Sequence, residues 1–303
     1  MNLAARANPC RCRWPANTLF RVSSFVLETL SREGMPRLIE VESLVKYYRD
    51  GGILSSGQVV PALQGVSFSI GLGKTLALVG ESGSGKTTVA LCLAGLERPS
   101  SGSIWFAGNN IAALSEKQLR AVRPQIQLVF QDPASSLNPR LTALEIVTEP
   151  LILQQKWTRR ETRERGFALL ERVGLPWQIG GRRAGECSGG QKQRLAIARA
   201  LSLEPKLLIL DEALSALDWS VQAQIANLLR ELQSSLALTY LFITHDLAMA
   251  AHLADEIAVI HRGRIVEKGI PEKIVDSPED EVTRSLVVAM PQSLVTPHKA
   301  GIC

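Results

Sequence analysis

A short glycine-rich stretch constrains this chain more than any other, because residues 80–87 read GESGSGKT. An apolar strand candidate at 75–79 runs into it, and an apolar helix candidate follows from Thr88. The spacing is that of the phosphate-binding loop G-x-x-x-x-G-K-[ST]. Glycines let backbone N–H groups approach phosphate oxygens, and the following helix turns its positive end toward the same anion. The pattern predicts an α/β protein with a nucleotide phosphate site, in preference to a plain glycine turn.

Each residue of this loop has an expected contact. The lysine would place a point charge on the β- and γ-phosphates, and the Thr87 hydroxyl would bind Mg²⁺. The backbone around them would surround the phosphates. The expected phosphate-binding residues are Gly80, Glu81, Ser82, Gly83, Ser84, Gly85, Lys86, Thr87 and Thr88.

Composition and charge narrow the class of protein. The 303 residues carry a net charge of +5, but residues 1–34 hold five arginines and two glutamates, or +3, which leaves +2 for the rest. We therefore expect no nucleic-acid partner. No apolar run reaches the roughly 18 residues that a membrane-spanning helix needs. The five scattered cysteines form neither a metal-ligand set nor a disulfide framework, which favours a reducing cytosol.

The first 34 residues lack the regular pattern that begins at Leu38. Polar residues interrupt the segment 16–30, so it does not have the apolar core of a secretory signal. We expect residues 1–35 to be disordered or absent from the native product, with translation starting at Met35.

Several further segments are expected to form strands. Residues 38–45 and 66–70 alternate like half-buried strands, residues 103–107 form another, and residues 256–261 and 264–268 form a hairpin. Residues 137–185 differ, because prolines at 139, 150 and 176 punctuate helical stretches. The charged face of the helix candidate 159–173 is interpreted as a solvated surface with i to i+4 pairs.

Polar side chains follow three buried strand candidates. Gln131 follows residues 126–130, Asp211 and Glu212 follow residues 206–210, and His245 lies just past residues 239–243. Such ends meet at one edge of a parallel sheet, where ligands bind. Two adjacent acids there indicate a Mg²⁺ ligand at Asp211 and a general base at Glu212. A lone histidine is usually structural, but its place at this edge favours a functional role.

Two other features are ambiguous by themselves. Tyr47 and Tyr48 precede the loop and are able to stack an adenine, although aromatic residues on strands more often serve packing. Residues 188–191, Ser-Gly-Gly-Gln, open a helix that continues to Leu201. They either offer bare N–H groups to an anion or form an ordinary helix cap.

Taken together, six elements resemble the nucleotide-binding subunit of ABC transporters over about residues 37–291. They are Tyr48, the loop 80–87, Gln131, the signature 188–191, Asp211-Glu212 with 215–218, and His245. The resemblance implies the P-loop NTPase fold: a RecA-like, mostly parallel sheet with an antiparallel β subdomain and a helical insert. It places the ABC ATPase domain at 36–270, the insert at about 133–187, and a family tail at 271–303.

The same resemblance implies an ATPase whose cassettes pair head to tail, so that each ATP lies between one phosphate loop and the opposite signature. Tyr48 would stack the adenine, and Thr87, Gln131 and Asp211 would hold Mg²⁺. Lys86, Glu212 and His245 would be catalytic: Glu212 would orient the attacking water and His245 would contact the γ-phosphate. The residues expected to close on the partner's ATP are Ser188, Gly189, Gly190 and Gln191.

Residues 130–140 and 283–291 are similar to the dipeptide/oligopeptide/nickel importer branch, and to the second of its two ATPase subunits. This implies import of a solute, with peptides expected, at the cytoplasmic face of the inner membrane. The implied partners are permease subunits, a second ATPase subunit (a paralogue or a copy), and indirectly a solute-binding protein. Three departures are Cys187 where leucine is usual, Ala213-Leu214 for Pro-Thr, and residues 280–282 for His-Pro-Tyr.

Other functions stay open at this point. One is a non-transport ABC ATPase of DNA repair, translation or a soluble enzyme complex such as carbon–phosphorus lyase. Another is import of nickel or a different solute. A third is a degenerate, mainly structural half of an ATPase pair, against which the intact Lys86, Ser188, Glu212 and His245 argue.

Overall fold

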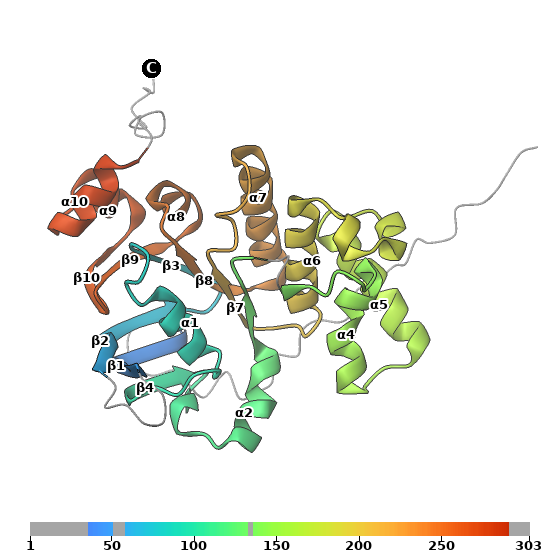
Figure 1. Ribbon diagram of the computed structural model, residues 1–303, viewed down its shortest axis with the longest axis horizontal. Coiled ribbons are helices and arrows are strands. Elements are labelled where there is room, and N and C mark those ends of the chain that lie inside the picture. Colours follow the sequence, from blue (N-terminus) through green and yellow to red (C-terminus); the bar gives the residue numbers. More distant parts are fainter. Residues whose placement is uncertain (1–35, 51–57, 133–135, 291–303) are drawn as a thin grey trace, which may run out of the picture. The chain divides into compact units, whose positions relative to one another are not determined.

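A six-stranded sheet, parallel except for one edge strand, organises the fold (Figure 1). The structure, a computed structural model, describes residues 36–50, 58–132 and 136–290. The strand order is β10-β9-β3-β8-β7-β6, and β10 alone runs antiparallel to its neighbour. The strands are β3 (Thr75–Val79), β6 (Ile126–Val129), β7 (Leu207–Asp211), β8 (Thr239–Thr244), β9 (Glu256–His261) and β10 (Arg264–Gly269). The expected mostly parallel sheet and the 256–268 hairpin are confirmed.

Continuous apolar runs form the inner strands because both faces of this sheet are covered. Every residue of β3, β7 and β8 is buried. Alternate side chains enter opposite clusters: Ala77 and Val79 pack on one face, Leu76 and Leu78 on the other. The first face carries helices α6 (Gly189–Leu201), α7 (Trp219–Leu236) and α8 (Leu247–Leu253) (Figure 1). The second face carries α1 (Lys86–Leu93) and a smaller antiparallel sheet (Figure 1).

The smaller sheet has the order β2-β1-β4-β5 and is antiparallel throughout. Its strands are β1 (Arg37–Asp50), β2 (Gln58–Gly71), β4 (Ser101–Phe106) and β5 (Asn109–Asn110). It confirms the antiparallel β subdomain. β1 and β2 are longer than the half-buried segments 38–45 and 66–70, because their pairing continues toward the hairpin tip, where alternation is lost and side chains such as Tyr47 are exposed.

Helices make up much of the rest of the described residues, and short 3₁₀ helices and loops connect them. The α-helices are α1 (Lys86–Leu93), α2 (Glu116–Val122), α4 (Ala143–Gln154), α5 (Arg159–Arg172), α6 (Gly189–Leu201), α7 (Trp219–Leu236), α8 (Leu247–Leu253), α9 (Pro271–Asp276) and α10 (Glu281–Val288). Capping boxes at Thr142, Thr158 and Ser188 start α4, α5 and α6. None of these helices combines the length and apolar character needed to cross a membrane.

Two helix boundaries differ from the sequence prediction. α1 begins at Lys86 and not at Thr88, because Gly85 adopts φ 108° and allows the loop to turn directly into the helix. Pro150 lies inside α4, although we expected it to punctuate the helix. Its ring removes one N–H donor, but Ile146, Val147 and Leu151 are buried around it, and this packing holds the helix together.

Three sequence expectations fall outside the described residues. They concern residues 1–35, residues 133–135 at the start of the insert, and the end of the tail beyond residue 290.

A buried glutamate fixes the segment that leads into α10. Glu267 on β10 accepts hydrogen bonds from the backbone N–H groups of Glu279 and Asp280, each at 3.0 Å. Burial by itself would raise the pKa of Glu267, but the Thr283 hydroxyl and the two backbone amides hold the pKa below its usual value. The ionised carboxylate therefore stabilises the packing of α10.

We predict that Glu267→Gln lowers the free energy of unfolding by about 1–2 kcal/mol, because its amide replaces one acceptor with a donor. Urea unfolding measures this loss, with the exposed Glu231→Gln on α7 as the control. In the wild type, the contribution of the Glu267 carboxylate to the free energy of unfolding should be complete above the unfolded-state pKa of about 4.3. It should be lost as the pH falls through the lower folded-state pKa. Equal stability of the two variants at neutral pH would contradict this role.

Candidate active site

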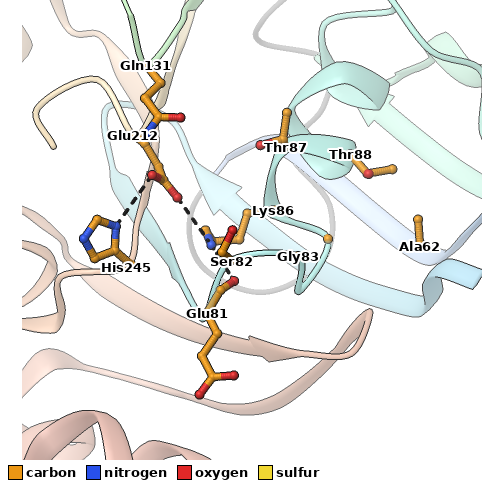
Figure 2. Close-up of a pocket in the computed structure, with 11 residues that line it drawn as sticks. Ala62, Glu81, Ser82, Gly83, Lys86, Thr87, Thr88, Gln131, Glu212 and His245 are labelled. Carbon is orange, nitrogen blue, oxygen red and sulfur yellow. Dashed lines mark hydrogen bonds and ion pairs between the residues drawn. The ribbon is translucent and has the colours of Figure 1, made fainter. Parts of the chain in front are cut away.

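A pocket of about 600 Å³ opens at the carboxyl edge of the central sheet. Parallel register brings the strand ends there together: Val79 pairs with Thr244, and Asp211 pairs with Ile243. The loop after β3, the segments after β6, β7 and β8, and one residue of β2 form its wall (Figure 2). The lining residues are Ala62, Glu81, Ser82, Gly83, Gly85, Lys86, Thr87, Thr88, Gln131, Glu212 and His245.

The Lys86 ammonium lies at the centre of this arrangement. Lys86 is 4% exposed. Its Nζ donates to the carbonyls of Gly80 and Glu81, each at 2.8 Å, and lies 3.5 Å from Glu212 Oε1 (Figure 2). The carbonyls fix the position of the ammonium within the loop. The charge is therefore held in place where a phosphate would enter.

Close backbone approaches lock the loop from outside. A Cβ on Gly85 would lie 2.7 Å from the Ala62 carbonyl oxygen, and one on Gly263 would lie 2.6 Å from the same atom. The Gly263 N–H donates to the Ser84 carbonyl at 2.9 Å, and the Gln64 N–H donates to the Gly263 carbonyl at 2.8 Å. The β9–β10 turn thus ties the phosphate loop to β2. Glycine is required at both positions because side chains would separate these backbones.

Glu212 reaches the pocket from a strained backbone. Its φ is 47°, in the left-handed region that costs a non-glycine residue about 1 kcal/mol or more. The N–H donates to the Ile243 carbonyl at 2.9 Å, and the carbonyl accepts from the Ser215 N–H at 3.1 Å and hydroxyl at 2.8 Å. These bonds aim the carboxylate between Lys86 and His245, whose Nδ1 lies 3.6 Å from Oε2 (Figure 2).

Asp211 is the most buried acid of the site. Its Oδ1 has no hydrogen-bond partner within the described parts of the chain. Burial raises the pKa of Asp211, and the charge of Glu212 adds to this, while the Thr87 hydroxyl and Lys86 oppose it. An unpaired, buried carboxylate oxygen beside a threonine hydroxyl is a donor set that suits a hard cation. Mg²⁺ in such sites takes one or two protein oxygens, with water and phosphate as the rest.

No cluster of three acidic, histidine or cysteine ligands occurs in the stretches that the structure describes. A dedicated protein-only metal cage is therefore absent from those stretches. The Asp211 and Thr87 oxygens fit a cation that is shared with a phosphate ligand, and Gln131 lies at the pocket wall with its side chain exposed.

The remaining predicted residues lie in three different places. Gly80 and Ser84 belong to the loop but do not line the pocket: a Cβ on Gly80 would lie 2.2 Å from the Ile260 carbonyl, and the Ser84 hydroxyl is buried. Tyr48 lies on β1 opposite Val60, two residues from Ala62. Ala62 could not be predicted from the sequence, because its contribution depends on a backbone approach and not on its side chain.

The signature residues 188–191 lie at the start of α6 and are not part of this pocket. They form a capping box: the Gln191 N–H donates to Ser188 Oγ at 3.3 Å, and the Ser188 N–H donates to Gln191 Oε1 at 3.0 Å. Gly190 packs against α7, since a Cβ there would lie 2.8 Å from Val221 Cγ1. The pocket therefore does not bring the signature and the phosphate loop of one chain together.

Comparison with known proteins gives consistent matches. Residues 63–215 match the protein family described as ABC transporter. The chain is 47% identical over 256 residues to the probable peptide ABC transporter ATP-binding protein y4tS of Sinorhizobium fredii, covering 84% of this chain and 72% of that protein. It is 43% identical over 262 residues to the dipeptide transport ATP-binding protein DppF of Haemophilus influenzae, covering 86% and 80%.

Among solved structures, the chain is similar to the ATP-binding cassette MJ0796, seen as a dimer in a post-hydrolysis state bound to ADP and Pi. The TM-score is 0.68 at 28% sequence identity, and the match covers 77% of this chain and 98% of that one. The fold that the sequence predicted is thus also the fold of a nucleotide-bound cassette.

We predict that Asp211→Asn raises the melting temperature of the protein measured without nucleotide. The neutral amide removes a buried charge with an unpaired oxygen, worth on the order of 1 kcal/mol, or roughly 1–2 °C for a chain of this size. Differential scanning calorimetry measures the shift, with Glu149→Gln on the exposed face of α4 as the control.

The difference should shrink as the pH falls toward the raised pKa of Asp211, because the wild-type acid then takes up its proton. A lower melting temperature for Asp211→Asn at neutral pH would show that the charge is compensated in the folded protein.

Proposed function

Because this chain belongs to the ABC transporter ATP-binding proteins, we propose that it hydrolyses ATP to drive the import of peptides through a membrane permease. The observation that carries the proposal is the identity of 43% and 47% to proteins named for dipeptide and peptide transport, over more than four fifths of the chain. The pocket at the phosphate loop supports the same reaction, since its acids and cations lie where a triphosphate would bind.

Different residues of the chain perform different steps of phosphoryl transfer to water. The loop backbone, Lys86 and Thr88 bind the phosphates, and the Lys86 ammonium stabilises charge on the γ-phosphate. Glu212 lies 3.5 Å from that ammonium. When a bound phosphate pairs with the Lys86 ammonium, the Glu212 carboxylate no longer has to compensate that charge. It can then accept a proton from the attacking water. His245 then contacts the γ-phosphate and stabilises its developing charge.

Asp211, Thr87 and Gln131 are the residues that would hold Mg²⁺. The buried, unpaired Oδ1 of Asp211 supports this assignment. The ion supplies positive charge to the β- and γ-phosphate oxygens when it is bound. Tyr48 is assigned to the adenine, because it lies two residues along the hairpin from the pocket wall at Ala62.

The signature residues 188–191 are assigned to the ATP of a partner cassette. Their position outside the pocket of their own chain supports this assignment, as does the dimeric state of the MJ0796 cassette. The partner is a second ATPase subunit, either a paralogue or a second copy. Together the pair binds permease subunits at the cytoplasmic face of the inner membrane, and a solute-binding protein delivers the peptide to that permease.

We predict that Glu212→Gln lowers ATP hydrolysis by about 10²- to 10⁴-fold and leaves ATP affinity within a factor of about two, because the amide cannot accept the proton from water. Phosphate release by the purified transporter complex gives the rate, and equilibrium dialysis gives the affinity. Glu231→Gln on the exposed face of α7 is the matched control. Wild-type turnover in Glu212→Gln would contradict the assignment of the base.

The transport assignment has its own test. A tagged copy of this chain, purified from detergent-extracted membranes, should bring hydrophobic permease subunits and a second ATPase with it. Cells that carry Glu212→Gln should lose uptake of labelled di- and oligopeptides. Copurification of soluble enzyme subunits in place of permeases would instead favour an ATPase of an enzyme complex.

A further inference from the structure

A lysine with no role in the reaction lies against the ring of Tyr48. Lys46 Nζ is 5.0 Å from the centroid of that ring, within the range of a cation–π contact. Tyr48 remains 37% exposed. The ammonium therefore fixes the ring and still leaves part of its surface accessible to a ligand.

Lys46 is itself held firmly in place. Its Nζ donates to Glu97 Oε2 at 2.7 Å and to the Arg98 carbonyl at 2.8 Å, and its side chain is 13% exposed. Burial alone would lower the pKa of Lys46, but the hydrogen bond and charge of Glu97 raise it above its ordinary value. The ammonium is thus charged at neutral pH and has little freedom to leave the ring.

The segment 97–100, which holds Lys46, also forms hydrogen bonds with the backbone of β1. The Ser100 N–H donates to the Val45 carbonyl at 2.8 Å, and the Tyr47 N–H donates to Ser100 Oγ at 3.1 Å. This segment follows α1, and α1 begins at Lys86. The strand that carries Tyr48 is therefore connected, through one helix, to the phosphate loop.

The register of the hairpin places the ring near the pocket. Lys46 pairs with Leu63 and Tyr47 pairs with Pro61, so Ala62 is the extra residue at this shift in register. Such bulges re-aim neighbouring side chains and often occur beside active sites. Tyr48 pairs with Val60, roughly 7 Å along the strand from Ala62, which lines the pocket.

From these contacts we propose that Lys46 is a positioning residue that orients the Tyr48 ring for adenine stacking and thereby sets the affinity of the site for the nucleotide base. The proposal rests on the proposed function, which assigns the adenine to Tyr48. It concerns the base and not the phosphates, because within the described residues the hydrogen bonds and ring contact of Lys46 go to Glu97, Arg98 and Tyr48, none of which lines the pocket.

The test compares a ligand with a base and a ligand without one on the full-length chain. Lys46→Met keeps the apolar stem and removes the ammonium. We expect its dissociation constant for ADP, measured by calorimetry with Mg²⁺ present, to rise about three- to tenfold. Its inhibition constant for pyrophosphate, measured by competition with ADP, should not change. Lys46→Arg should restore ADP affinity, because a guanidinium also stacks on aromatic rings.

Three further variants serve as controls. Lys268→Met removes another lysine ion pair, with Glu256 at 2.9 Å, and should leave both constants unchanged. In a Tyr48→Ala background, Lys46→Met should add no further loss of ADP affinity, because the ring that it orients is gone. Glu97→Gln weakens the ion pair that holds Lys46 and should therefore weaken ADP binding by a smaller factor. This variant replaces Lys46→Met in the test if Lys46→Met folds poorly.

The outcomes separate the two proposals. Two results would overturn the role of Lys46 alone. One is that Lys46→Met weakens the binding of ADP and of pyrophosphate equally. The other is that Lys46→Met leaves ADP binding unchanged while Tyr48→Ala weakens it. Unchanged ADP affinity in Tyr48→Ala would overturn the adenine assignment of the proposed function, and the inference with it.

Discussion

The buried ammonium of Lys86 sets the geometry of everything around it. A charge that is nearly out of water must be compensated by polar groups at short range. The carbonyls of Gly80 and Glu81 provide this from within the loop. Glu212 approaches the ammonium from the end of β7, where its backbone adopts a left-handed conformation. Two segments with unusual backbone conformations therefore meet at one cation. Glycines allow the conformation of the loop, and the hydrogen bonds of Ser215 hold that of Glu212.

How much of this could be predicted from sequence depends on the range of the interactions. Gln131, Asp211 and His245 lie at the ends of strands that are mostly apolar, and parallel pairing brings these ends together. The local sequence pattern was sufficient to predict these three positions. It was not sufficient to predict Ala62, whose carbonyl lies against Gly85 and Gly263, or Lys46, whose partner Glu97 is 51 residues away. These contacts arise only when distant segments meet, so neither periodicity nor motif spacing encodes them.

The departures from the family pattern have structural explanations in the core and at a helix cap. Cys187, Ala213 and Leu214 are buried and belong to the large hydrophobic cluster, and they do not line the pocket. The Cys187 thiol donates weakly to the Arg183 carbonyl at 3.5 Å. Asp280 caps α10 by accepting from the Val282 N–H at 2.8 Å. These residues therefore serve the core and a helix cap, and none of them lines the pocket.

The hydrogen bond from Gly263 to the Ser84 carbonyl has a consequence for biosynthesis. A ribosome makes Gly263 about 180 residues after Ser84, and at 5–20 residues per second this takes roughly 10 to 40 s. Until then the phosphate loop lacks the turn that holds it against β2. A nascent chain thus emerges with its nucleotide motif already synthesised but not yet locked. Cellular ATP meets a finished site only after nearly the whole cassette has left the ribosome.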